Sequence, residues 1–475
     1  MIDIRIETLG CRLNQIESEA AARFFIDNGF SVDMKSIASS STEDFETRLC
    51  ILNTCTVTQK AEQKARRIIR LQLKKYPSAC VLVTGCYAQL NPEEIKAMDG
   101  RIAVLGGQIK SRIAEVPSLL KSSLSKGDWT PLAFARIINE NLSAVPSEKK
   151  NFPEQSFKLS TSSFLSHSRA SLKIQDGCNN ACSFCAIHIA RGHSVSIPVD
   201  VALERVRELE EGGNDEVVIT TVNIAQYRAE HEGRTFNFSR LLDYLLENTK
   251  HIAFRISSLY PEVVDDEFCR VIKNPRVRPH FHISVQSGSD FILERMNRIY
   301  KANAVVEACN KLRLAKENPF LACDIITGFP GETHEDFLQT LELCNKCGFA
   351  WIHAFPFSER PGTPAASMKP KVPQNVSGER ARQITDFAIN SKINYVNQFA
   401  GKELEAVLET VRRPSALSSK SKILVYHAVT ENFIHCEIQT EAPLTVNKSV
   451  RLRIVKALPE RILKGGDIEA LAELC

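Results

Sequence analysis

Three cysteines lie within eight consecutive residues of this 475-residue chain, in the order Cys178-Asn-Asn-Ala-Cys182-Ser-Phe-Cys185. A strand predicted over 170–175 leads into them, and Gly177 precedes the first cysteine. Thiolates this close in sequence must share one loop, and their spacing can hold three irons of a [4Fe-4S] cluster, which normally takes four protein thiolates. The missing fourth thiolate leaves one iron open to another ligand.

Two other interpretations of the cysteine triplet stay open. One is a zinc site, but such sites favour paired C-x2-C units with two further ligands nearby. The next cysteine downstream is Cys269, which is distant in sequence. The other interpretation is three unrelated buried thiols. The spacing favours a cluster over both.

The composition is typical of an ordinary globular protein, with 43% hydrophobic and 24% charged residues. The length predicts about three domains. No apolar run approaches the roughly 18 residues of a membrane span, and the N-terminus is too charged for a signal peptide. We therefore expect a cytoplasmic protein with no membrane association. Its fifteen cysteines indicate reduced thiols and metal ligation rather than disulfides.

The first 120 residues alternate between predicted strands and helices, which favours a doubly wound parallel sheet. Strands are expected at 2–9, 30–37, 49–53 and 79–84. Helices are expected at 15–28 and 58–75, and a further helix opens at Asn91-Pro92.

Cys11, Cys55 and Cys86 directly follow three of these predicted strands. In an open α/β sheet, ligands bind at the carboxyl ends of the strands, so the three thiols could converge on one site although they are far apart in sequence. The alternative is three separate core cysteines. Convergence would create a second three-thiolate cluster site.

The centre of the chain again alternates between strands and helices, and this order predicts a partial (βα)6 barrel. Residues 121–167 separate it from the first domain and are rich in Ser, Lys, Asn and Pro, so we expect a linker. Short apolar stretches in it, such as 134–138, could dock on a domain surface. A long amphipathic helix, 376–400, is expected to be a packing strut after the barrel.

Chemistry in such barrels sits at the carboxyl ends of the strands. Asn223, Gln286 and the turn from Gly328 to Glu332 occupy those positions. Backbone amides of a turn that opens a helix can receive a carboxylate or a ribose. An ordinary Pro-Gly turn is an equally good explanation of the last segment.

The C-terminal residues 402–458 are predicted to form four or five strands of a small β-barrel. Between residues 401 and 464 there are eleven Lys and Arg against seven Glu and no Asp, an excess equal to the whole net charge of +4. A polyanion is most plausibly bound there. The candidate phosphate contacts are Lys448, Arg451, Arg453 and Lys456, although each could equally belong to a solvated charged face.

A second basic element is the helix predicted over 58–75. It carries seven basic residues against the single acid Glu62, too lopsided a ratio for solubility alone. Lys64 and Arg67 on this helix are further candidate contacts to an RNA backbone.

Several motifs resemble one known family. The triplet, with Phe184 before its last cysteine, resembles the radical S-adenosylmethionine signature. Three N-terminal segments resemble the first domain of the radical S-adenosylmethionine methylthiotransferases, especially the subgroup that acts on N6-threonylcarbamoyladenosine at position 37 of tRNA. These segments are Thr8-Leu-Gly-Cys11-Arg-Leu-Asn14, Asn53-Thr-Cys55-Thr-Val-Thr58 and Thr84-Gly-Cys86-Tyr-Ala-Gln89.

The central and C-terminal segments extend the resemblance. The segments His282-Ile-Ser-Val-Gln286, Asp324-Ile-Ile-Thr-Gly328-Phe-Pro-Gly-Glu332 and 353–364 match family segments. One departure is Thr221, where the family usually has Gly after the second barrel strand. The C-terminal barrel is similar to the TRAM RNA-binding domain. The expected division is 1–120, a linker at 121–167, the radical domain with its trailing helix at 168–400, the TRAM domain at 401–464 and a tail at 465–475.

The resemblance implies a tRNA-modifying enzyme with two [4Fe-4S] clusters and S-adenosylmethionine. Cys178, Cys182 and Cys185 would hold the cluster that reduces S-adenosylmethionine to a 5′-deoxyadenosyl radical, which removes hydrogen from C2 of adenine. The N-terminal trio would hold an auxiliary cluster that carries the sulfur to be methylated and transferred. Asn223, Gln286, Gly328 and Glu332 would contact S-adenosylmethionine. The implied partners are tRNA and an electron donor such as flavodoxin or ferredoxin.

Three alternatives remain at this point. Sister enzymes of the family act on N6-isopentenyladenosine at the same tRNA position or on an aspartate of a ribosomal protein. A non-enzymatic RNA-binding protein with structural zinc would keep the basic barrel, but it would leave six cysteines with poor zinc spacing.

Overall fold

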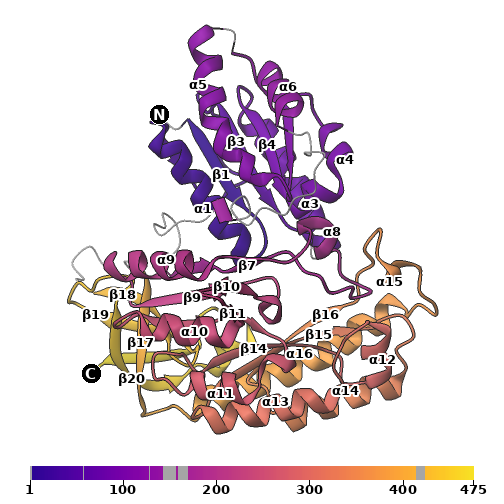
Figure 1. Ribbon diagram of the computed structural model, residues 1–475, viewed down its shortest axis with the longest axis vertical. Coiled ribbons are helices and arrows are strands. Elements are labelled where there is room, and N and C mark those ends of the chain that lie inside the picture. Colours follow the sequence, from indigo (N-terminus) through magenta and orange to yellow (C-terminus); the bar gives the residue numbers. More distant parts are fainter. Residues whose placement is uncertain (1–2, 57, 128, 143–156, 159–168, 413–422) are drawn as a thin grey trace. The chain divides into compact units, whose positions relative to one another are not determined.

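The structure is a computed structural model, and it describes residues 3–56, 58–127, 129–142, 157–158, 169–412 and 423–475 (Figure 1). Contacts within the chain divide it into two units, each described here by itself. The first unit comprises Met1–Ser166, Lys173–Asn180 and Cys185–Ile197, and the second comprises His167–Leu172, Ala181–Phe184 and Pro198–Cys475.

The first unit is built on a five-stranded parallel sheet in the order β2-β1-β3-β4-β5. Its strands are β1 (Ile4–Thr8), β2 (Val32–Asp33), β3 (Leu49–Thr54), β4 (Cys80–Gly85) and β5 (Ile102–Gly106). This order reverses direction between β1 and β3, as in doubly wound folds. The predicted parallel doubly wound sheet is confirmed, with β2 shorter than expected and β5 additional.

Helices connect the strands of this sheet and cover it. They are α1 (Arg12–Asp27), α2 (Gln59–Lys75), α3 (Cys86–Leu90), α4 (Pro92–Lys96), the 3-10 turn η1 (Lys110–Glu115), α5 (Val116–Lys126) and α6 (Pro131–Asn141). Thr58 caps α2 by accepting a hydrogen bond from the amide of Ala61 at 3.1 Å. On α2, Ala65, Ile68 and Ile69 are buried, while the basic side chains lie on the other side.

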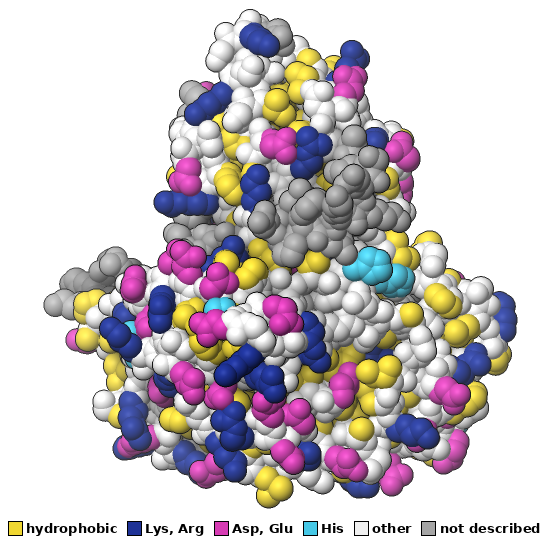
Figure 2. Space-filling model, viewed as in Figure 1, with side chains coloured by type: hydrophobic (Ala, Val, Ile, Leu, Met, Phe, Trp, Pro, Cys, Tyr) yellow, Lys and Arg dark blue, Asp and Glu magenta, His cyan; other side chains and the backbone are white. Residues whose placement is uncertain are grey.

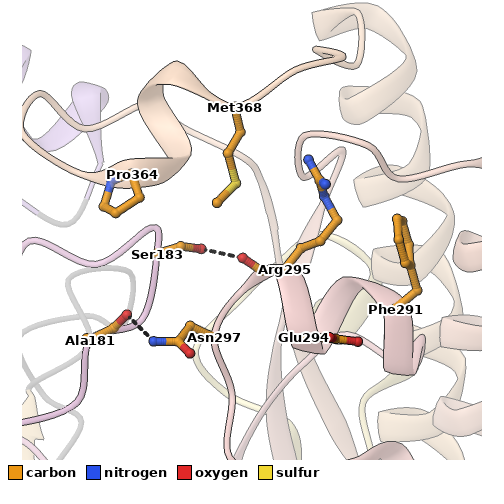
Figure 3. Close-up of a pocket in the computed structure, with 8 residues that line it drawn as sticks. All are labelled: Ala181, Ser183, Phe291, Glu294, Arg295, Asn297, Pro364 and Met368. Atoms are coloured by element: carbon orange, nitrogen blue, oxygen red, sulfur yellow. Dashed lines mark hydrogen bonds between the residues drawn. The ribbon is translucent and has the colours of Figure 1, made fainter.

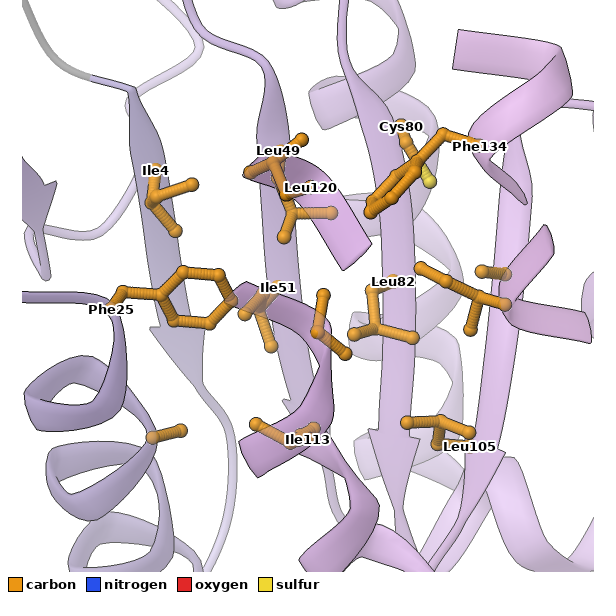
Figure 4. Close-up of a cluster of buried hydrophobic side chains, with 14 of the residues drawn as sticks. Ile4, Phe25, Leu49, Ile51, Cys80, Leu82, Leu105, Ile113, Leu120 and Phe134 are labelled. Atoms are coloured by element: carbon orange, nitrogen blue, oxygen red, sulfur yellow. The ribbon is translucent and has the colours of Figure 1, made fainter. Parts of the chain in front are cut away.

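The prediction of a linker beginning at residue 121 is wrong for its first part. Helix α6 packs on the sheet, and its Phe134, Ala135 and Ile138 are fully buried in one core with Ile51 and Leu82 (Figure 4). The surrounding composition is polar, but these three apolar residues lie at helical spacing and form one continuous buried stripe, which stabilises the helix on the sheet. The remainder of the expected linker, apart from Phe157 and Lys158, lies outside the described residues.

The second unit contains the predicted partial (βα)6 barrel, which is confirmed. Its strands form two sheets of neighbouring strands, β12-β9-β6 and β13-β14-β15-β16, and every registered pair is parallel. The strands are β6 (Ala170–Lys173), β9 (Glu216–Thr220), β12 (Ala253–Ile256), β13 (Ser258–Leu259), β14 (His280–Gln286), β15 (Phe320–Thr327) and β16 (Trp351–Pro356). Because β12 and β13 are separated by one residue, they act as one broken strand, which gives six strand positions.

Helices flank the barrel, with α11, α13 and α14 side by side along its outer surface (Figure 1). The barrel helices are α9 (Val199–Glu211), α10 (Phe238–Glu247), α11 (Asp266–Ile272), α12 (Asp290–Arg295), α13 (Ala302–Ala315), α14 (His334–Cys347), α15 (Pro364–Ser367) and α16 (Gln374–Asn397). The 3-10 turns are η2 (Ile224–Gln226) and η3 (Pro261–Val263). A hairpin not predicted from sequence, β10 (Ala229–His231) with β11 (Arg234–Phe236), follows η2. In the first unit the short element β7 (Gln175–Asp176) precedes the cysteine triplet in sequence, and α8 (Ile187–Arg191) and β8 (Val195–Ser196) follow it.

The C-terminal strands close into a barrel in the order β17-β18-β19-β21-β20. They are β17 (Glu403–Arg412), β18 (Leu424–Thr430), β19 (His435–Thr440), β20 (Ser449–Ala457) and β21 (Ala470–Leu474), with α17 (Pro459–Leu463) before the last strand. The predicted tail at 465–475 is therefore wrong, because β21 pairs with both β19 and β20. Its Ala, Leu and Glu residues have low strand propensity, and pairing to two neighbours overrides it.

One core cluster joins this barrel to the preceding elements of the second unit. Phe320 and Ala350 from the central barrel, Val396 from α16 and Leu452 and Ile454 from β20 belong to it. Among the described residues, none of the helices combines the length and apolarity that a bilayer crossing requires.

Candidate functional site

The three N-terminal cysteines follow adjacent strands of the first sheet. Cys11 directly precedes α1 after β1, Cys55 follows β3 and Cys86 begins α3 after β4. The sheet order changes direction between β1 and β3, which is where doubly wound folds bind their ligands. Cys55 and Cys86 are buried, and Cys11 is exposed.

Two glycines allow the cysteine loops to pack closely. Gly10 has a φ of +107°, and a Cβ placed on it would lie 2.4 Å from the Cβ of Cys55. Gly85 has a φ of +94°, and its Cβ would lie 2.3 Å from the carbonyl oxygen of Thr54. Only glycine tolerates both the backbone angle and the close approach. The loops after β1, β3 and β4 are thus held in mutual contact.

Asn14 ties the first two loops together. Its side-chain nitrogen donates hydrogen bonds of 3.0 Å to the carbonyl oxygens of Leu9 and Thr54, which lie two and one residues before Cys11 and Cys55. Its side-chain oxygen accepts a 2.7 Å hydrogen bond from Arg191. The amide therefore links one backbone carbonyl group near Cys11 to one beside Cys55.

A buried network of charges lies beneath these loops within the first unit. The carboxylate of Glu17 contacts Lys110 at 2.5 Å, Lys173 at 2.9 Å and Arg191 at 3.1 Å. Arg191 also contacts Asp176 at 2.8 Å. Burial alone would raise the pKa of Glu17, but the three cations lower it to about 2. Both carboxylates are therefore ionised and matched by buried cations.

The positive charge of this network extends to the third cysteine. Burial raises the pKa of the Cys86 thiol, while Arg191 and Lys110 oppose the shift and Cys11 adds to it. Burial outweighs these cations, so the pKa of the Cys86 thiol stays above its ordinary value.

The triplet loop supplies hydrogen-bond donors to its own sulfurs. The backbone amide of Asn180 lies 3.4 Å from the Cys178 Sγ, and the amide of Ile187 lies 3.4 Å from the Cys185 Sγ. Amide-to-sulfur bonds at i+2 are expected where a thiolate carries negative charge. Such bonds also tune iron–sulfur potentials.

Cys182 receives a charged donor instead. The Arg298 guanidinium lies 3.2 Å from the Cys182 Sγ and stacks over the rings of Tyr260 and Tyr300, with its central carbon 4.7 and 4.8 Å from the two ring centres. Burial lowers the pKa of Arg298, but Tyr300, Tyr260 and Cys182 outweigh burial and raise it. The arginine is thus held rigidly and charged beside the sulfur. Three thiols with such donors fit a [4Fe-4S] cluster whose fourth iron is open.

Asn223, Gln286 and Gly328, predicted to contact a cofactor, all lie at carboxyl ends of barrel strands or just beyond them. Asn223 accepts a hydrogen bond from the amide of Ala225 at 3.1 Å and so caps η2. Gln286 ends β14 with a φ of +73°. Gly328 follows β15. The structure therefore gives these three residues corresponding positions at the carboxyl ends of parallel strands.

Glu332 has a different environment from the other predicted residues. Its carboxylate accepts two 3.0 Å hydrogen bonds from the amide of Gly328 and pairs with Arg380. Burial raises its pKa, and the Gly328 amide and Arg380 partly offset the rise. Its carboxylate therefore holds the turn in shape.

Two buried hydroxyls at the same strand ends have no partner among the described residues. They are the side-chain oxygens of Thr221, after β9, and Ser257, between β12 and β13. A buried hydroxyl without a hydrogen bond costs about 1–3 kcal/mol. Polar groups of this kind are expected where a polar ligand completes the site. Thr221 is one of the positions at which the sequence departs from the family pattern.

A cluster in the barrel interior was not predicted from sequence. An imidazole nitrogen of His282 on β14 lies 2.9 Å from a carboxylate oxygen of Asp324 on β15, and the ring of His353 on β16 lies 5.5 Å from that of His282. Burial would raise the pKa of Asp324, but the hydrogen bond and charge of His282 lower it. Along these strands, alternate residues are less buried than their neighbours. This alternation identifies the cluster only when the pairing register of the barrel strands is known.

The two predicted RNA-binding regions differ in how their charges are paired. Lys64 and Arg67 on α2 are exposed. On the C-terminal barrel, Arg451 and Arg453 both pair with Glu403, at 3.2 and 2.8 Å, and Lys448 pairs with Asp215 at 3.2 Å. Lys456 is also exposed. Over the elements of the second unit, the face in Figure 2 shows Lys and Arg interspersed with Asp and Glu.

A cavity of about 530 Å³ lies beside the part of the triplet loop that belongs to the second unit (Figure 3). Ser183 donates a 2.8 Å hydrogen bond to the carbonyl oxygen of Arg295, and Asn297 donates one of 2.8 Å to that of Ala181. Ala181 and Ser183 flank Cys182 in the sequence. Phe291 and Met368 give the cavity an apolar wall.

Comparisons with known proteins agree with this architecture. Residues 172–344 match the Radical SAM superfamily, and residues 3–107 match the Uncharacterized protein family UPF0004. The chain is 40% identical to the threonylcarbamoyladenosine tRNA methylthiotransferase MtaB of Treponema pallidum, over 96% of this chain and 98% of that protein. It is 34% identical to the protein of the same name from Thermotoga maritima, over 91% and 92%, and 31% identical to that from Bacillus subtilis, over 96% and 94%. The chain belongs to the radical S-adenosylmethionine methylthiotransferase family.

Proposed function

We propose that this protein transfers a methylthio group to C2 of N6-threonylcarbamoyladenosine at position 37 of tRNA. The observation that carries the proposal is the identity of 31–40% to three enzymes named for that substrate, each aligned over at least 91% of this chain. Two separate sets of three cysteines support the proposal. One set follows the ends of adjacent strands, and the other lies in one loop.

We assign the two sets to two clusters. Cys178, Cys182 and Cys185 would hold the cluster that, when bound, supplies the electron for radical formation from S-adenosylmethionine, and the N-terminal trio would hold an auxiliary [4Fe-4S] cluster that supplies sulfur. A radical is needed because the C2–H bond of adenine is too weakly acidic for a side-chain base. Arg191 and Lys110 support the second assignment, because these cations oppose the rise that burial causes in the pKa of the Cys86 thiol.

The barrel residues would orient S-adenosylmethionine at the strand ends. Asn223 and Gln286 offer amides, and Gly328 allows close approach of the backbone. The buried hydroxyls of Thr221 and Ser257, for which the described residues offer no hydrogen-bond partner, would gain hydrogen bonds there. Glu332 acts indirectly, by fixing the Gly328 turn through its backbone amide.

The adenine would enter the open face of the barrel. An enzyme that acts on a base atom must take the base out of its stack and hold it against apolar or aromatic surface. Phe355 is 42% exposed and stacks against His353, with the ring centres 6.4 Å apart at an interplanar angle of 13°. His353 and the His282–Asp324 pair supply hydrogen-bonding groups beside this surface.

The tRNA backbone would contact Lys64 and Arg67 of the N-terminal domain and Lys448, Arg451, Arg453 and Lys456 of the C-terminal, TRAM-like barrel. The electron would come from a small redox protein such as flavodoxin or ferredoxin. The cavity between Ala181 and Met368, beside Cys182, is a suitable contact because it lies next to a cluster ligand and has an apolar wall with Arg295 beside it. We infer a cytoplasmic location, where tRNA and these donors occur.

Analysis of modified nucleosides tests this function. A strain lacking the gene should lose 2-methylthio-N6-threonylcarbamoyladenosine and accumulate the unmethylthiolated nucleoside, and the wild-type gene should restore it. Loss of the methylthiolated isopentenyl nucleoside instead would assign the chain to the sister enzymes. A relative of that type from Wolbachia, tRNA-2-methylthio-N(6)-dimethylallyladenosine synthase, is 29% identical to this chain. Unchanged tRNA with an altered ribosomal-protein aspartate would indicate the third activity.

The non-enzymatic alternative has a simpler test. A protein with two [4Fe-4S] clusters is brown after anaerobic purification and contains about eight irons per chain. A zinc-containing RNA-binding protein is colourless, and a colourless preparation without iron would contradict the proposal.

A further inference from the structure

Three side chains of the C-terminal barrel gather at a place that the proposed function does not use. They are Glu409 on β17, His427 on β18 and His435 on β19, and one ligand atom from each lies within 4.8 Å of the other two. The three strands are consecutive neighbours in the barrel. The cluster therefore brings together residues from three separate strands at one point.

The backbone is shaped to bring Glu409 into this cluster. The register between β17 and β18 pairs Leu408 with Ala428 and Thr410 with His427, so that Glu409 is the extra residue of a β-bulge. Bulges redirect a side chain and occur preferentially at functional positions. In a regular strand the side chains alternate strictly between the two faces, and a residue at position 409 would then point in another direction.

The two imidazole rings face each other through nitrogen atoms. His427 Nε2 lies 3.1 Å from His435 Nδ1, and His427 Nδ1 lies 3.3 Å from an oxygen of Glu409. Two ring nitrogens this close require an electropositive atom between or beside them, which is either a proton or a metal ion. A metal ion bound by all three groups would replace those shared protons.

Neighbouring groups hold the ligands in place. The other oxygen of Glu409 accepts a 2.5 Å contact from Arg169, which fixes the carboxylate. The backbone amide of His435 donates to Glu469 at 3.1 Å.

The nearby cations do not exclude a metal ion, because each is paired with a carboxylate. Lys392 contacts Glu469 at 2.8 Å, and Arg255 contacts Glu216 at 2.7 Å. Arg169 is paired with Glu409 itself, and it would hold this metal ligand in position without binding the ion.

We propose that Glu409, His427 and His435 bind one divalent transition-metal ion, with zinc the best fit. Two imidazole nitrogens and one carboxylate oxygen are a common zinc donor set, and they leave a fourth position open. His427 and His435 also line a cavity of about 540 Å³ whose other walls include Glu437, Asp467 and Glu469. Arg461, which pairs with Glu437 at 3.1 Å, also lines this cavity, and the fourth position is left for water. The ion clamps β17, β18 and β19 together.

The first test uses the full chain with its clusters reconstituted, so that the cluster cysteines are occupied. The protein is incubated with zinc sulfate and freed of excess metal by gel filtration, and its zinc is examined by X-ray absorption at the zinc edge. We expect one zinc per chain with nitrogen and oxygen ligands at about 2.0–2.1 Å and no sulfur shell near about 2.3 Å. Absence of retained zinc, or zinc with sulfur ligands, overturns the proposal.

The second test uses matched variants. His427→Gln and His435→Gln should each lose the bound zinc. His251→Gln should retain it, because His251 is a surface histidine paired with Glu210 at 3.4 Å and lies outside the cluster. Retention of zinc by His427→Gln would overturn the assignment of ligands. Iron content and circular dichroism report whether each variant folds. If a variant does not fold, the X-ray absorption spectrum of the wild-type protein alone decides whether zinc is bound by nitrogen and oxygen ligands.

Discussion

The guanidinium of Arg191 donates a 2.7 Å hydrogen bond to the side-chain oxygen of Asn14, a residue 177 positions away in sequence. Through Asn14 it reaches the carbonyl oxygens that precede Cys11 and Cys55. Through its 2.8 Å contact with Asp176 it reaches the residues that precede Cys178. One buried side chain therefore connects the backbone that precedes Cys11 and Cys55 with the backbone that precedes Cys178, all within the first unit.

Replacing Arg191 by Met should strongly destabilise the first unit. The substitution leaves Glu17 and Asp176 with fewer cationic partners, and breaking a buried ion pair in this way costs about 3–5 kcal/mol. Urea unfolding followed by fluorescence measures the change. Arg270→Met is the control, because Arg270 pairs with Asp243 on the surface, where such pairs contribute about 0–1 kcal/mol. Equal effects of the two substitutions would contradict the role of the network.

The second unit should lose stability in acid because of Glu216. This buried carboxylate pairs with Arg255 and Arg278, and these arginines lower its pKa from 4.5 to about 2 although burial opposes the shift. A lowered pKa in the folded state stabilises the fold above pH 4.5, and the contribution is lost as the pH falls towards 2. The shift corresponds to a loss on the order of 3 kcal/mol.

Comparison of the wild type with Glu216→Gln isolates this effect. The variant should be less stable at pH 7, since both arginines lose their charged partner, and its stability should depend less on pH between about 4.5 and 2. Urea midpoints at pH 7, 5, 4 and 3, measured on the cluster-free chain, provide the data. Parallel pH curves for the two proteins would contradict the assignment.

Arg298 should raise the reduction potential of the cluster that we assign to Cys182. A hydrogen bond from a charged group contributes about 1.5–3 kcal/mol, and 59 mV corresponds to 1.4 kcal/mol for a one-electron couple. Arg298→Met should therefore lower the potential by up to roughly 60–130 mV. An electron paramagnetic resonance titration measures it in a Cys11/Cys55/Cys86 triple alanine background. Arg295→Met is the control, since Arg295 bonds to the carbonyl oxygen of Pro330 rather than to sulfur.

The basic face of α2 should contribute more to tRNA affinity than the paired arginines of the C-terminal barrel. Each phosphate contact contributes about 0.9 to the slope of log affinity against log salt. The double variant Lys64→Ala/Arg67→Ala should lower this slope by about 2. Arg451→Ala/Arg453→Ala should change it less, because Glu403 already neutralises part of their charge. Filter binding at several salt concentrations distinguishes the two outcomes.

Two residues of α6 should respond very differently to truncation. Phe134 is fully buried in the core of the N-terminal sheet, whereas Leu132 is 59% exposed. Phe134→Ala should cost about 3–5 kcal/mol, and Leu132→Ala should cost less than about 0.5 kcal/mol. Thermal unfolding of the two variants measures the difference. A mild effect of Phe134→Ala would mean that α6 contributes little to the domain.

Features that depend on local sequence were predictable. The alternation of strands and helices in the centre of the chain, to which the strand Phe320–Thr327 and the helix His334–Cys347 belong, was predictable from hydrophobic patterning, and the capping threonine Thr333 marks the start of that helix. The placement of Cys11, Cys55 and Cys86 after adjacent strands followed from the geometry of parallel sheets.

Features that depend on distant partners were not predictable. Glu17 and Lys173 are ordinary surface residue types, and their burial is evident only when the charges of Lys110, Asp176 and Arg191 are placed around them. The bulge at Glu409 requires the register with β18. The His282–Asp324 pair requires the register between β14 and β15. Sequence specifies such residues only after the fold is known.

The core cluster that contains Phe320, Val396 and Leu452 has a consequence for the history and engineering of this protein. A domain that is joined to its neighbour only by a tether can be exchanged between proteins by recombination at the tether. Here a cut at residue 400 would divide a shared apolar interior, and each fragment would expose surface that promotes aggregation. A chimera with a foreign RNA-binding barrel would require the helix α16 to be transplanted as well.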